Sequence, residues 1–315
     1  MSVFIIRRIL QSLIVVLAMS LIVFLAVHVV GDPVYILISD EMTQKEIEEF
    51  IRKLGLDRPV HEQYWHFLVN AASGDLGNSF VHGESALKLI LQRMPATLEL
   101  ALAALLIAVL FGVPLGVYAG LHPDSLASRT IMAGSILGFS LPTFWVGLMM
   151  IMVFAVMLGW LPATGRGDFM TWDGLRHLAL PAINLALFKL SLVIRLARAG
   201  TREAALQDYV KFARAKGLSA RRVVLVHVMK NILIPVITVL GLEFGGLIAF
   251  SVVTETVFAW PGMGKLLIDS ILRLDRPVVV AYLVITVLMF VVINLVVDIL
   301  YSVLDPRVRL REVKA

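Results

Sequence analysis

Two ionisable residues interrupt stretches of the chain that are otherwise apolar over a membrane-spanning length. Lys189 lies within the apolar segment 178–197, and Glu243 lies within the apolar segment 232–252. An isolated charge is costly to bury in lipid, so each residue should have a partner or face a wet cavity. We hypothesise that both face a polar pathway through the membrane, where they pair with each other or with the charged ends of a solute. The alternative is a structural pair away from that pathway.

A glycine-rich stretch, AWPGMGKL, approaches the phosphate-binding pattern G-x-x-x-x-G-K-[ST] without matching it. Ala259 stands at the first glycine of that pattern, and Leu266 replaces its Ser or Thr. We interpret the stretch as a tight turn shaped by Pro261, Gly262 and Gly264. The sequence also shows no cluster of a nucleophile with a base. The chain is therefore expected to have no ATPase or other enzymatic activity of its own.

Metal and nucleic-acid binding are not expected either. The sequence contains no cysteine, which excludes disulfides and thiolate metal sites. His61 and His66 are five residues apart, so one helix would not stack them on the same face. The formal net charge of +5 comes from basic residues that flank apolar segments. That placement is typical of a membrane protein rather than of a nucleic-acid-binding protein.

Six apolar segments are each long enough to cross a bilayer as a helix, which takes about 20 residues. Composition agrees, because 59% of the residues are hydrophobic and only 16% are charged. Backbone groups in lipid must be satisfied within the segment, so we predict an all-α, polytopic membrane protein with six transmembrane helices. The expected spans are 9–30, 97–118, 131–158, 178–197, 232–252 and 278–301.

Lysine and arginine residues predict the orientation of these spans. Basic residues precede the first span, cluster between the fourth and fifth spans, and follow the sixth. The segment 31–96 has more acidic than basic residues, so it is expected outside, with both termini in the cytoplasm. The first segment is also open to interpretation as a signal peptide. Its apolar run exceeds the usual length of about 7–15 residues, so we expect an uncleaved span.

Glycines at GxxxG spacing recur in three of the apolar segments. Helices in lipid gain little from hydrophobic contrast, so close packing at small residues matters for their association. The glycines mark packing either within this chain or against another subunit. They are Gly112, Gly116, Gly120, Gly134, Gly138, Gly241 and Gly245. Prolines that are expected to bend or break spans are Pro114, Pro142 and Pro181.

The basic segment 199–231, between the fourth and fifth spans, is expected to form two helices around a glycine. Residues 208–216 are rich in helix formers. Gly217 then ends or redirects the first helix, and Ser219 is placed to cap the second. A solvated, positively charged loop would explain the charge of the segment, but it would not explain two ordered helices.

The segment around Gly217 resembles the coupling loop of permease subunits of bacterial ATP-binding-cassette (ABC) importers, specifically in the dipeptide and oligopeptide branch. ARAKG, at 213–217, is followed by His227, Asn231 and Pro235 as in that branch. The more general Glu-Ala-Ala pattern of such permeases is absent, because its three positions hold KFA.

Further motifs extend the resemblance to nearly the whole chain. GLDRPVHEQYWHFL with GDLGNSF is similar to the outer segment after the first span, and DILYSVLDPRVR is similar to the C-terminal signature. ETVFAWPGMGKLLIDSILRLDRPVV resembles the outer loop between the last two spans. Phe258 and Trp260 are expected at the membrane interface. The outer-loop motif is represented by Glu255, Phe258, Pro261, Gly262 and Gly264.

The resemblance implies a type I ABC importer permease fold in the cell inner membrane. Residues 1–96 would hold the first transmembrane helix and an external helical segment. Residues 97–302 would form the core of five helices, with the coupling loop at about 199–231. Residues 303–315 would be a cytoplasmic tail.

The resemblance also implies a set of partners. The chain would form half of a translocation pathway that works by alternating access, together with a second homologous permease and surrounding lipid. Two cytoplasmic ATP-binding subunits would carry ATP and Mg, and an external solute-binding protein would deliver the substrate. The chain itself would bind no cofactor. The residues expected to couple to the ATPase are Tyr209, Ala213, Arg214, Ala215, Lys216, Gly217 and Leu218.

Dipeptides and oligopeptides are the substrate class that the resemblance implies. Related importers for nickel, glutathione or oligosaccharides are the alternative. A secondary transporter would usually show inverted repeats, and we find no convincing internal repeat. A membrane-embedded enzyme would need a catalytic cluster within the spans, which the sequence does not show.

Overall fold

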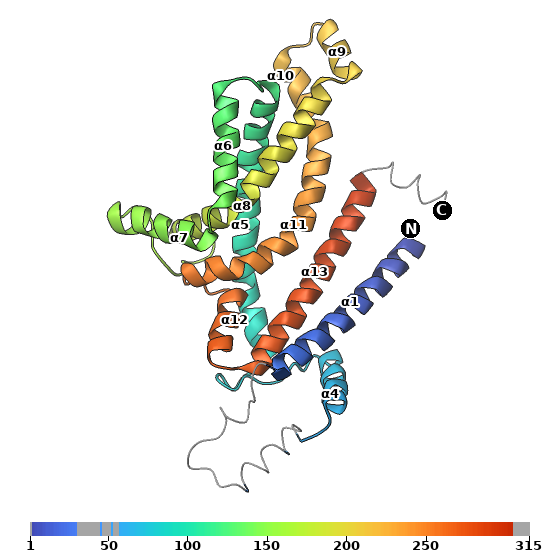
Figure 1. The fold of residues 1–315 in the computed structure, drawn as a ribbon, viewed down its shortest axis with the longest axis vertical. Helices are drawn as coiled ribbons and strands as arrows, with labels where there is room; N and C mark the ends of the chain where they lie inside the picture. The colour runs from blue at the N-terminus through green and yellow to red at the C-terminus, as the bar shows by residue number, and fades with distance from the viewer. Residues whose placement is uncertain (1, 30–44, 46–51, 53–56, 305–315) are drawn as a thin grey trace. The chain divides into compact units, whose positions relative to one another are not determined.

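The computed structural model describes residues 2–29, 45, 52 and 57–304. The described part consists of helices and loops, with one isolated antiparallel bridge between Asn78 and Ser85 (Figure 1). The prediction of an all-α chain is confirmed. Part of the external helical segment expected within residues 1–96, and almost all of the tail expected at 303–315, lie outside the described residues.

The helices follow the apolar segments of the sequence. In chain order they are α1 (Ser2–Val29), α4 (Val60–Ala72), α5 (Ala86–Leu121), α6 (Leu126–Ser140), α7 (Thr143–Met150), the π-helix η1 (Ile151–Met157), α8 (Trp172–Ala205), α9 (Asp208–Ala215), α10 (Ala220–Arg222), the π-helix η2 (Val223–Val228), α11 (Met229–Val257), α12 (Met263–Leu272) and α13 (Arg276–Leu304).

Candidate membrane spans agree broadly with the six predicted. Within the described residues, four helices are long and apolar enough to cross a bilayer, namely α5, α8, the continuous run Ala220–Val257, and Arg276–Val297 of α13. The helix pair α6 with α7–η1 supplies a fifth candidate if it counts as one span. The first predicted segment is the 28-residue helix α1, of which Leu13–Leu25 counts as a shorter apolar helix.

The third predicted span is not one helix, and here the sequence prediction is corrected. The chain bends by 104° between α6 and α7. Proline disfavours helical geometry in the residue before it, and Leu141, which precedes Pro142, is extended at φ −83° and ψ 137°. The break expected at Pro142 is therefore real. By contrast, α5 stays helical through Pro114, and α8 stays helical through Pro181.

The chain divides into two compact units, which are described separately. The first unit comprises Met1–Pro95 and Gly262–Val292, and the second comprises Ala96–Pro261 and Ile293–Ala315. In the first unit, α4 packs on α1. The Tyr64 hydroxyl lies 2.9 Å from the Ser20 hydroxyl, and the Tyr64 ring lies 5.3 Å from the Phe24 ring. These contacts tie α4 to α1.

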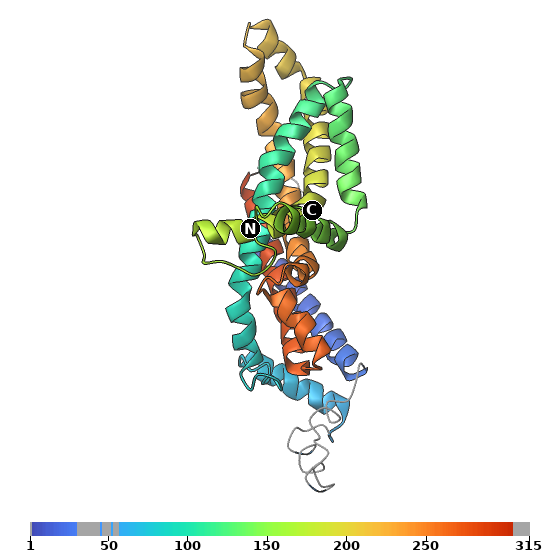
Figure 2. The ribbon, with the colours of Figure 1, turned by 90° about the vertical axis from the view of Figure 1, so that its left-hand side faces the viewer.

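In the second unit, α8 lies beside α6 and also beside α5 (Figures 1 and 2). The glycines of α5 allow a close approach to α8. A Cβ atom at Gly116 would lie 2.5 Å from the Ile194 carbonyl oxygen, and one at Gly112 would lie 2.8 Å from Val193. Packing within one chain is therefore the correct interpretation for this glycine run. Around Gly134 of α6, in contrast, a Cβ atom would meet nothing within 4 Å in this chain.

Gly116→Ala should destabilise the chain, because the added methyl group would press on the α8 backbone. Overpacking of this kind costs about 1–3 kcal/mol, more than the gain of up to about 1 kcal/mol in helix propensity. We expect a lower thermal unfolding midpoint in detergent. Gly134→Ala is the matched control and should unfold at the same or a higher temperature. Equal midpoints for the two variants would contradict close packing at Gly116.

Candidate functional site

Lys189 of α8 and Glu243 of α11 form an ion pair in the second unit. The Lys189 side chain is only 3% exposed, whereas that of Glu243 is 40% exposed. The Lys189 ammonium also lies 5.2 Å from the centre of the Phe188 ring. The structure thus joins the two charges that the sequence analysis singled out, and it turns the carboxylate toward the surface. The place of this pair on a transport pathway stays a prediction.

The basic segment folds as α9, a glycine turn and the continuous run α10–η2–α11. Gly217 has a φ of +76°, which L-residues with a side chain rarely adopt. Its amide donates to the Arg214 carbonyl at 2.9 Å, and the Leu218 amide donates to the Ala213 carbonyl at 3.3 Å. Ser219 takes the N-cap position of α10, but its side chain makes no capping hydrogen bond. The predicted turn is present, and the predicted side-chain cap is not.

One face of α9 packs against the core of the second unit, and the other face is exposed. Val210 and Ala213 are buried in a core cluster that includes Val223 and Val228 of η2. Ala213 thus helps to position the helix, and its expected part in coupling stays a prediction. Leu218 packs against the same cluster. The other expected contact residues, Tyr209, Arg214, Ala215, Lys216 and Gly217, are exposed.

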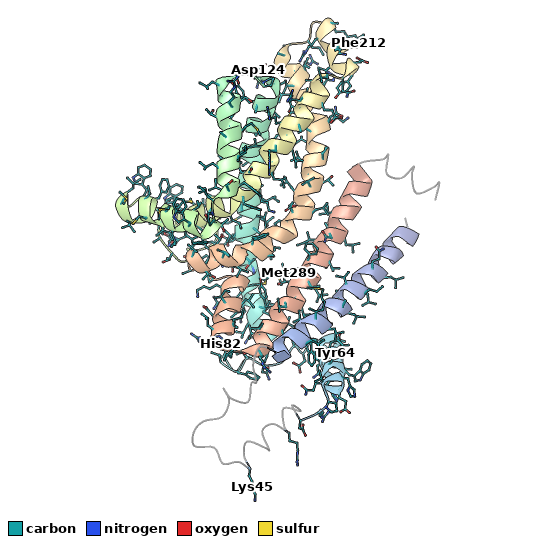
Figure 3. The ribbon with its side chains drawn as sticks, in the orientation of Figure 1. Lys45, Tyr64, His82, Asp124, Phe212 and Met289 are labelled. Atoms are coloured by element: carbon teal, nitrogen blue, oxygen red, sulfur yellow. The ribbon has the colours of Figure 1, made fainter. Side chains whose placement is uncertain are left out.

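Phe212 is an exposed aromatic residue of α9 that the sequence analysis did not single out. Its side chain is 62% exposed, and it projects from the same end of the second unit as Asp124 (Figure 3). The Lys216 ammonium lies 4.6 Å from the centre of its ring. The exposed surface thus combines an aromatic ring with basic side chains, a combination suited to an acidic or aromatic partner surface.

Two polar contacts involve the N-terminal part of α9. Lys211 donates a hydrogen bond to the Asp208 carboxylate, and that bond and its charge hold the pKa of Asp208 below its usual value. Asn231 of α11 donates to the Tyr209 hydroxyl at 2.8 Å. The bond between Asn231 and Tyr209 ties α9 to α11.

The C-terminal end of α11 is fixed by a buried carboxylate. Glu255 is fully buried and accepts hydrogen bonds from Thr97 at 2.7 Å and from Ser251 at 2.9 Å. Phe258 and Trp260 are buried as well, so their predicted position at the membrane interface is wrong. The reason is the turn after α11, in which Ala259 takes a left-handed φ of +47° and folds both rings inward.

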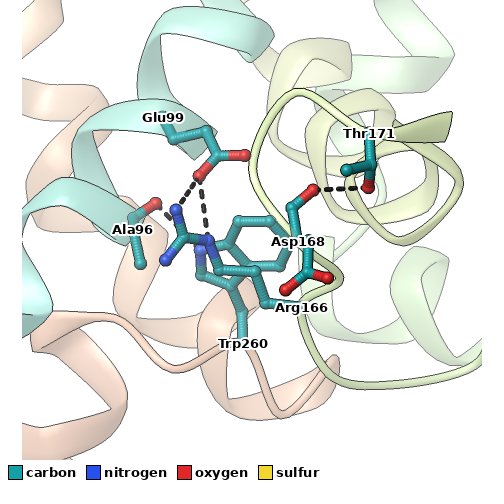
Figure 4. A network of polar contacts seen from close by, with 6 residues as sticks. All are labelled: Ala96, Glu99, Arg166, Asp168, Thr171 and Trp260. Atoms are coloured by element: carbon teal, nitrogen blue, oxygen red, sulfur yellow. Dashed lines mark hydrogen bonds and ion pairs between the residues drawn. The ribbon is translucent and has the colours of Figure 1, made fainter. Parts of the chain in front are cut away.

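An ion pair beside this turn was not found from the sequence. Arg166 donates to Glu99 through Nε at 2.9 Å and through Nη2 at 2.5 Å (Figure 4). Its guanidinium lies 5.8 Å from the Trp260 ring, and the indole of Trp260 donates to the Ala96 carbonyl at 2.8 Å. The available signal was an acidic residue, Glu99, inside a predicted apolar span. The pair fastens the loop before α8 to α5.

In the first unit, Gly262 caps α12 and Gly264 lies buried in its first turn. Beyond α12, the buried Asp275 carboxylate accepts hydrogen bonds from the Ser79 hydroxyl and, at 3.0 Å, from the Phe80 amide. Two separate outer motifs of the sequence, GDLGNSF and ILRLDRP, thereby dock on each other.

Asp275→Ala should loosen the outer segment, because it removes the acceptor of two hydrogen bonds. Bonds to a charged group contribute about 1.5–3 kcal/mol each, so we expect faster proteolysis between residues 74 and 86. Asp269→Ala is the control, because the Asp269 side chain is 48% exposed and its pair with Lys265 is weak. Identical digestion of the two variants would show that Asp275 does not hold this segment.

No group of three or more His, Cys, Asp or Glu residues that could hold a metal ion occurs in the described part of the chain. The polar side chains described above instead bond to one another or to the backbone. This arrangement positions helices and presents charged surfaces, and it assembles no reaction centre from the residues named here.

Comparison with known proteins places the chain in a family. Residues 112–310 match the binding-protein-dependent transport system inner membrane component, and residues 1–101 match the N-terminal part of such membrane components. The chain is 42% identical to the di/tripeptide transport system permease protein DppB of Pseudomonas aeruginosa, covering 89% of this chain and 90% of that protein. It is 39% identical to the oligopeptide transport system permease protein AppB of Bacillus subtilis, covering 98% and 99%.

Two further similarities are informative. The glutathione transport system permease protein GsiC of Escherichia coli K12 is 38% identical, over 97% of this chain and 98% of that protein. An inward-facing structure of the MetNI methionine ABC transporter has a TM-score of 0.55 at 16% identity, covering 69% of this chain and 96% of that chain. The latter likeness concerns the fold alone. The chain belongs to the family of inner membrane components of binding-protein-dependent transport systems, and it is a multi-pass permease protein of the inner membrane.

Proposed function

We propose that the chain is the permease subunit of an ATP-driven importer for dipeptides or oligopeptides and forms half of its translocation pathway. The observation that carries the proposal is the similarity to DppB and AppB, at 42% and 39% identity over most of the chain. Within the described residues, four helices are long and apolar enough to cross a bilayer, and the bent pair α6 with α7–η1 is a fifth candidate; these helices would provide the membrane part of such a pathway.

The proposal includes the partners of such an importer. A second, homologous permease would complete the pathway, and two cytoplasmic subunits would bind ATP and Mg and hydrolyse the nucleotide. An external solute-binding protein would deliver the substrate. Both termini would lie in the cytoplasm, as the distribution of basic residues predicts. We also propose that the chain divides into a first part at 1–96, a core at 97–302 and a tail at 303–315.

Roles for the individual surfaces follow from their geometry. The exposed face of α9, with Tyr209, Phe212, Arg214 and Lys216, is the surface that would seat on an ATPase subunit. Motion of that subunit would pass through the rigid contacts of α9 with η2 and α11 into the membrane part. The Lys189–Glu243 pair would lie on the pathway, and the Glu255 to Gly264 region would shape the outer end.

Glutathione is the second candidate substrate, because GsiC is nearly as similar to this chain as the peptide permeases are. The measurement is ATP-dependent uptake of labelled dialanine and of labelled glutathione by proteoliposomes that contain the assembled complex and its binding protein. Uptake of dialanine supports the main proposal, and uptake of glutathione alone supports the second. Transport by this chain without any ATP-binding subunit would contradict both.

A further inference from the structure

Three phenylalanine rings from three different helices of the second unit meet in one cluster. Phe139 of α6 and Phe188 of α8 are stacked, with ring centres 4.9 Å apart and an angle of 21° between the rings. Phe250 of α11 joins them at 5.9 Å from Phe188, with its ring tilted by 41°. These distances fall in the range of favourable aromatic pairs. We call Phe139, Phe188 and Phe250 the aromatic cluster.

The aromatic cluster is open on one side. Phe139 is 46% exposed and Phe250 is 61% exposed, whereas Phe188 is partly buried between them. In a membrane protein, an exposed aromatic surface can face lipid, another subunit or a water-filled pathway. The residues around the cluster indicate which of these three environments it faces.

Charged groups border the aromatic cluster on both sides. The Arg195 guanidinium lies 5.4 Å from the Phe139 ring, and its Nε donates to the Ser191 carbonyl at 3.3 Å. Arg195 is exposed, and no carboxylate among the described residues forms an ion pair with it. On the other side, Lys189 lies over Phe188 and holds the exposed carboxylate of Glu243.

The charged groups beside the aromatic cluster argue against a surface that faces lipid. Exposed charges within a transmembrane segment are costly in hydrocarbon, and they are found at wet cavities or bundle interiors. The Arg195 side chain is exposed, and the Glu243 side chain is 40% exposed. Phe139 lies beside Arg195, and Phe188 lies beside Lys189, the partner of Glu243. Apolar rings bordered by the Arg195 cation on one side and by the Lys189–Glu243 pair on the other also match the chemistry of a short peptide, which carries apolar side chains between an ammonium and a carboxylate group.

We infer that the aromatic cluster is a subsite of the translocation pathway that contacts the bulky apolar side chains of a peptide in transit. The inference rests on the proposed function and makes it more specific. Flat rings accept apolar side chains of many shapes, so the subsite would favour bulky residues without selecting one of them. Small side chains would pass without using it.

The first test uses the absence of cysteine from the chain, so that each introduced thiol is unique in this subunit. Phe139→Cys and Phe250→Cys are placed in the full complex and treated with a charged, membrane-impermeant methanethiosulfonate reagent during ATP turnover. We expect both to react at least about tenfold faster than Phe111→Cys, because thiols react as thiolates and need water. Phe111, on α5, is the matched control because it is 59% exposed and none of the charged groups described above borders it.

The second test separates this inference from the proposed function. Maximal uptake rates are measured at saturating loaded binding protein, first with dialanine and then with leucylphenylalanine. We expect Phe250→Ala and Phe139→Ala to lower uptake of leucylphenylalanine severalfold more than uptake of dialanine. Unreactive cysteines at 139 and 250, as lipid or a covering partner subunit would produce, would overturn the inference, and so would equal effects on both peptides. Failure of the unaltered complex to import either peptide would instead refute the proposed function.

Discussion

Glu243→Gln should destabilise the assembled permease more than Lys189→Met does. Loss of the carboxylate charge leaves an ammonium that is 3% exposed and faces a neutral amide and the Phe188 ring, and removing the charge of one partner of a buried pair costs up to about 3–5 kcal/mol. Loss of the ammonium leaves a carboxylate that is 40% exposed and still reaches water. The measurement is the thermal midpoint of the detergent-solubilised complex. The reverse order of midpoints would contradict the burial described for Lys189.

Uptake should fall about tenfold or more in both variants, equivalent to about 1.4 kcal/mol on the rate-limiting barrier. The double variant Lys189→Glu with Glu243→Lys distinguishes a pathway role from a structural role. It retains opposite charges, so assembly should recover. If the side chain at position 243 faces the substrate, the double variant presents a positive charge to the substrate in place of a negative one, and uptake stays low. Full recovery of uptake would identify a structural pair, and normal uptake in both single variants would remove the pair from the mechanism.

Gly217→Val should uncouple the permease from its ATPase. The φ of +76° at this turn is strained for any side chain and most of all for a β-branched one, at about 1–2 kcal/mol or more. No atom would meet an added Cβ within 4 Å, so the effect comes from the backbone alone. A changed turn would redirect α9 relative to α10. We expect loss of uptake and weaker retention of the ATP-binding subunits on an affinity-tagged permease.

Gly217→Asn is the control for this experiment, because asparagine tolerates the left-handed region better than other residues with a side chain. It should retain most of the uptake and most of the bound ATPase. Wild-type retention and uptake by the valine variant would show that the glycine turn does not set the orientation of α9. Low uptake with full ATPase retention in that variant would place the defect in motion rather than in binding.

The helices were largely predictable because their signal is local. Long apolar segments are visible in the sequence, and lipid allows them few structures besides a helix. Gly217 and Pro142 were also predictable as points where the chain changes direction, since their backbone restrictions belong to the residues themselves. The 104° bend after α6 was not predictable, because proline interrupts a helix without fixing where the next helix points.

The polar partners depended on packing. The ion pair of Arg166 with Glu99 joins residues 67 positions apart, and the hydrogen bond of Ser79 with Asp275 joins residues 196 apart. Neither spacing carries a periodic signal. The burial of Phe258 and Trp260 was likewise mispredicted, because an aromatic residue at the end of a span is equally consistent with an interface position or an inward turn.

The helical and apolar segments, the places where basic charge gathers and the family resemblance were all predictable from the order of residues, because hydropathy and backbone preference act along the chain. Other features depended on how separate helices pack in space. These are the charges that meet, the face of α9 that stays exposed, and the joining of Phe139, Phe188 and Phe250 into one surface.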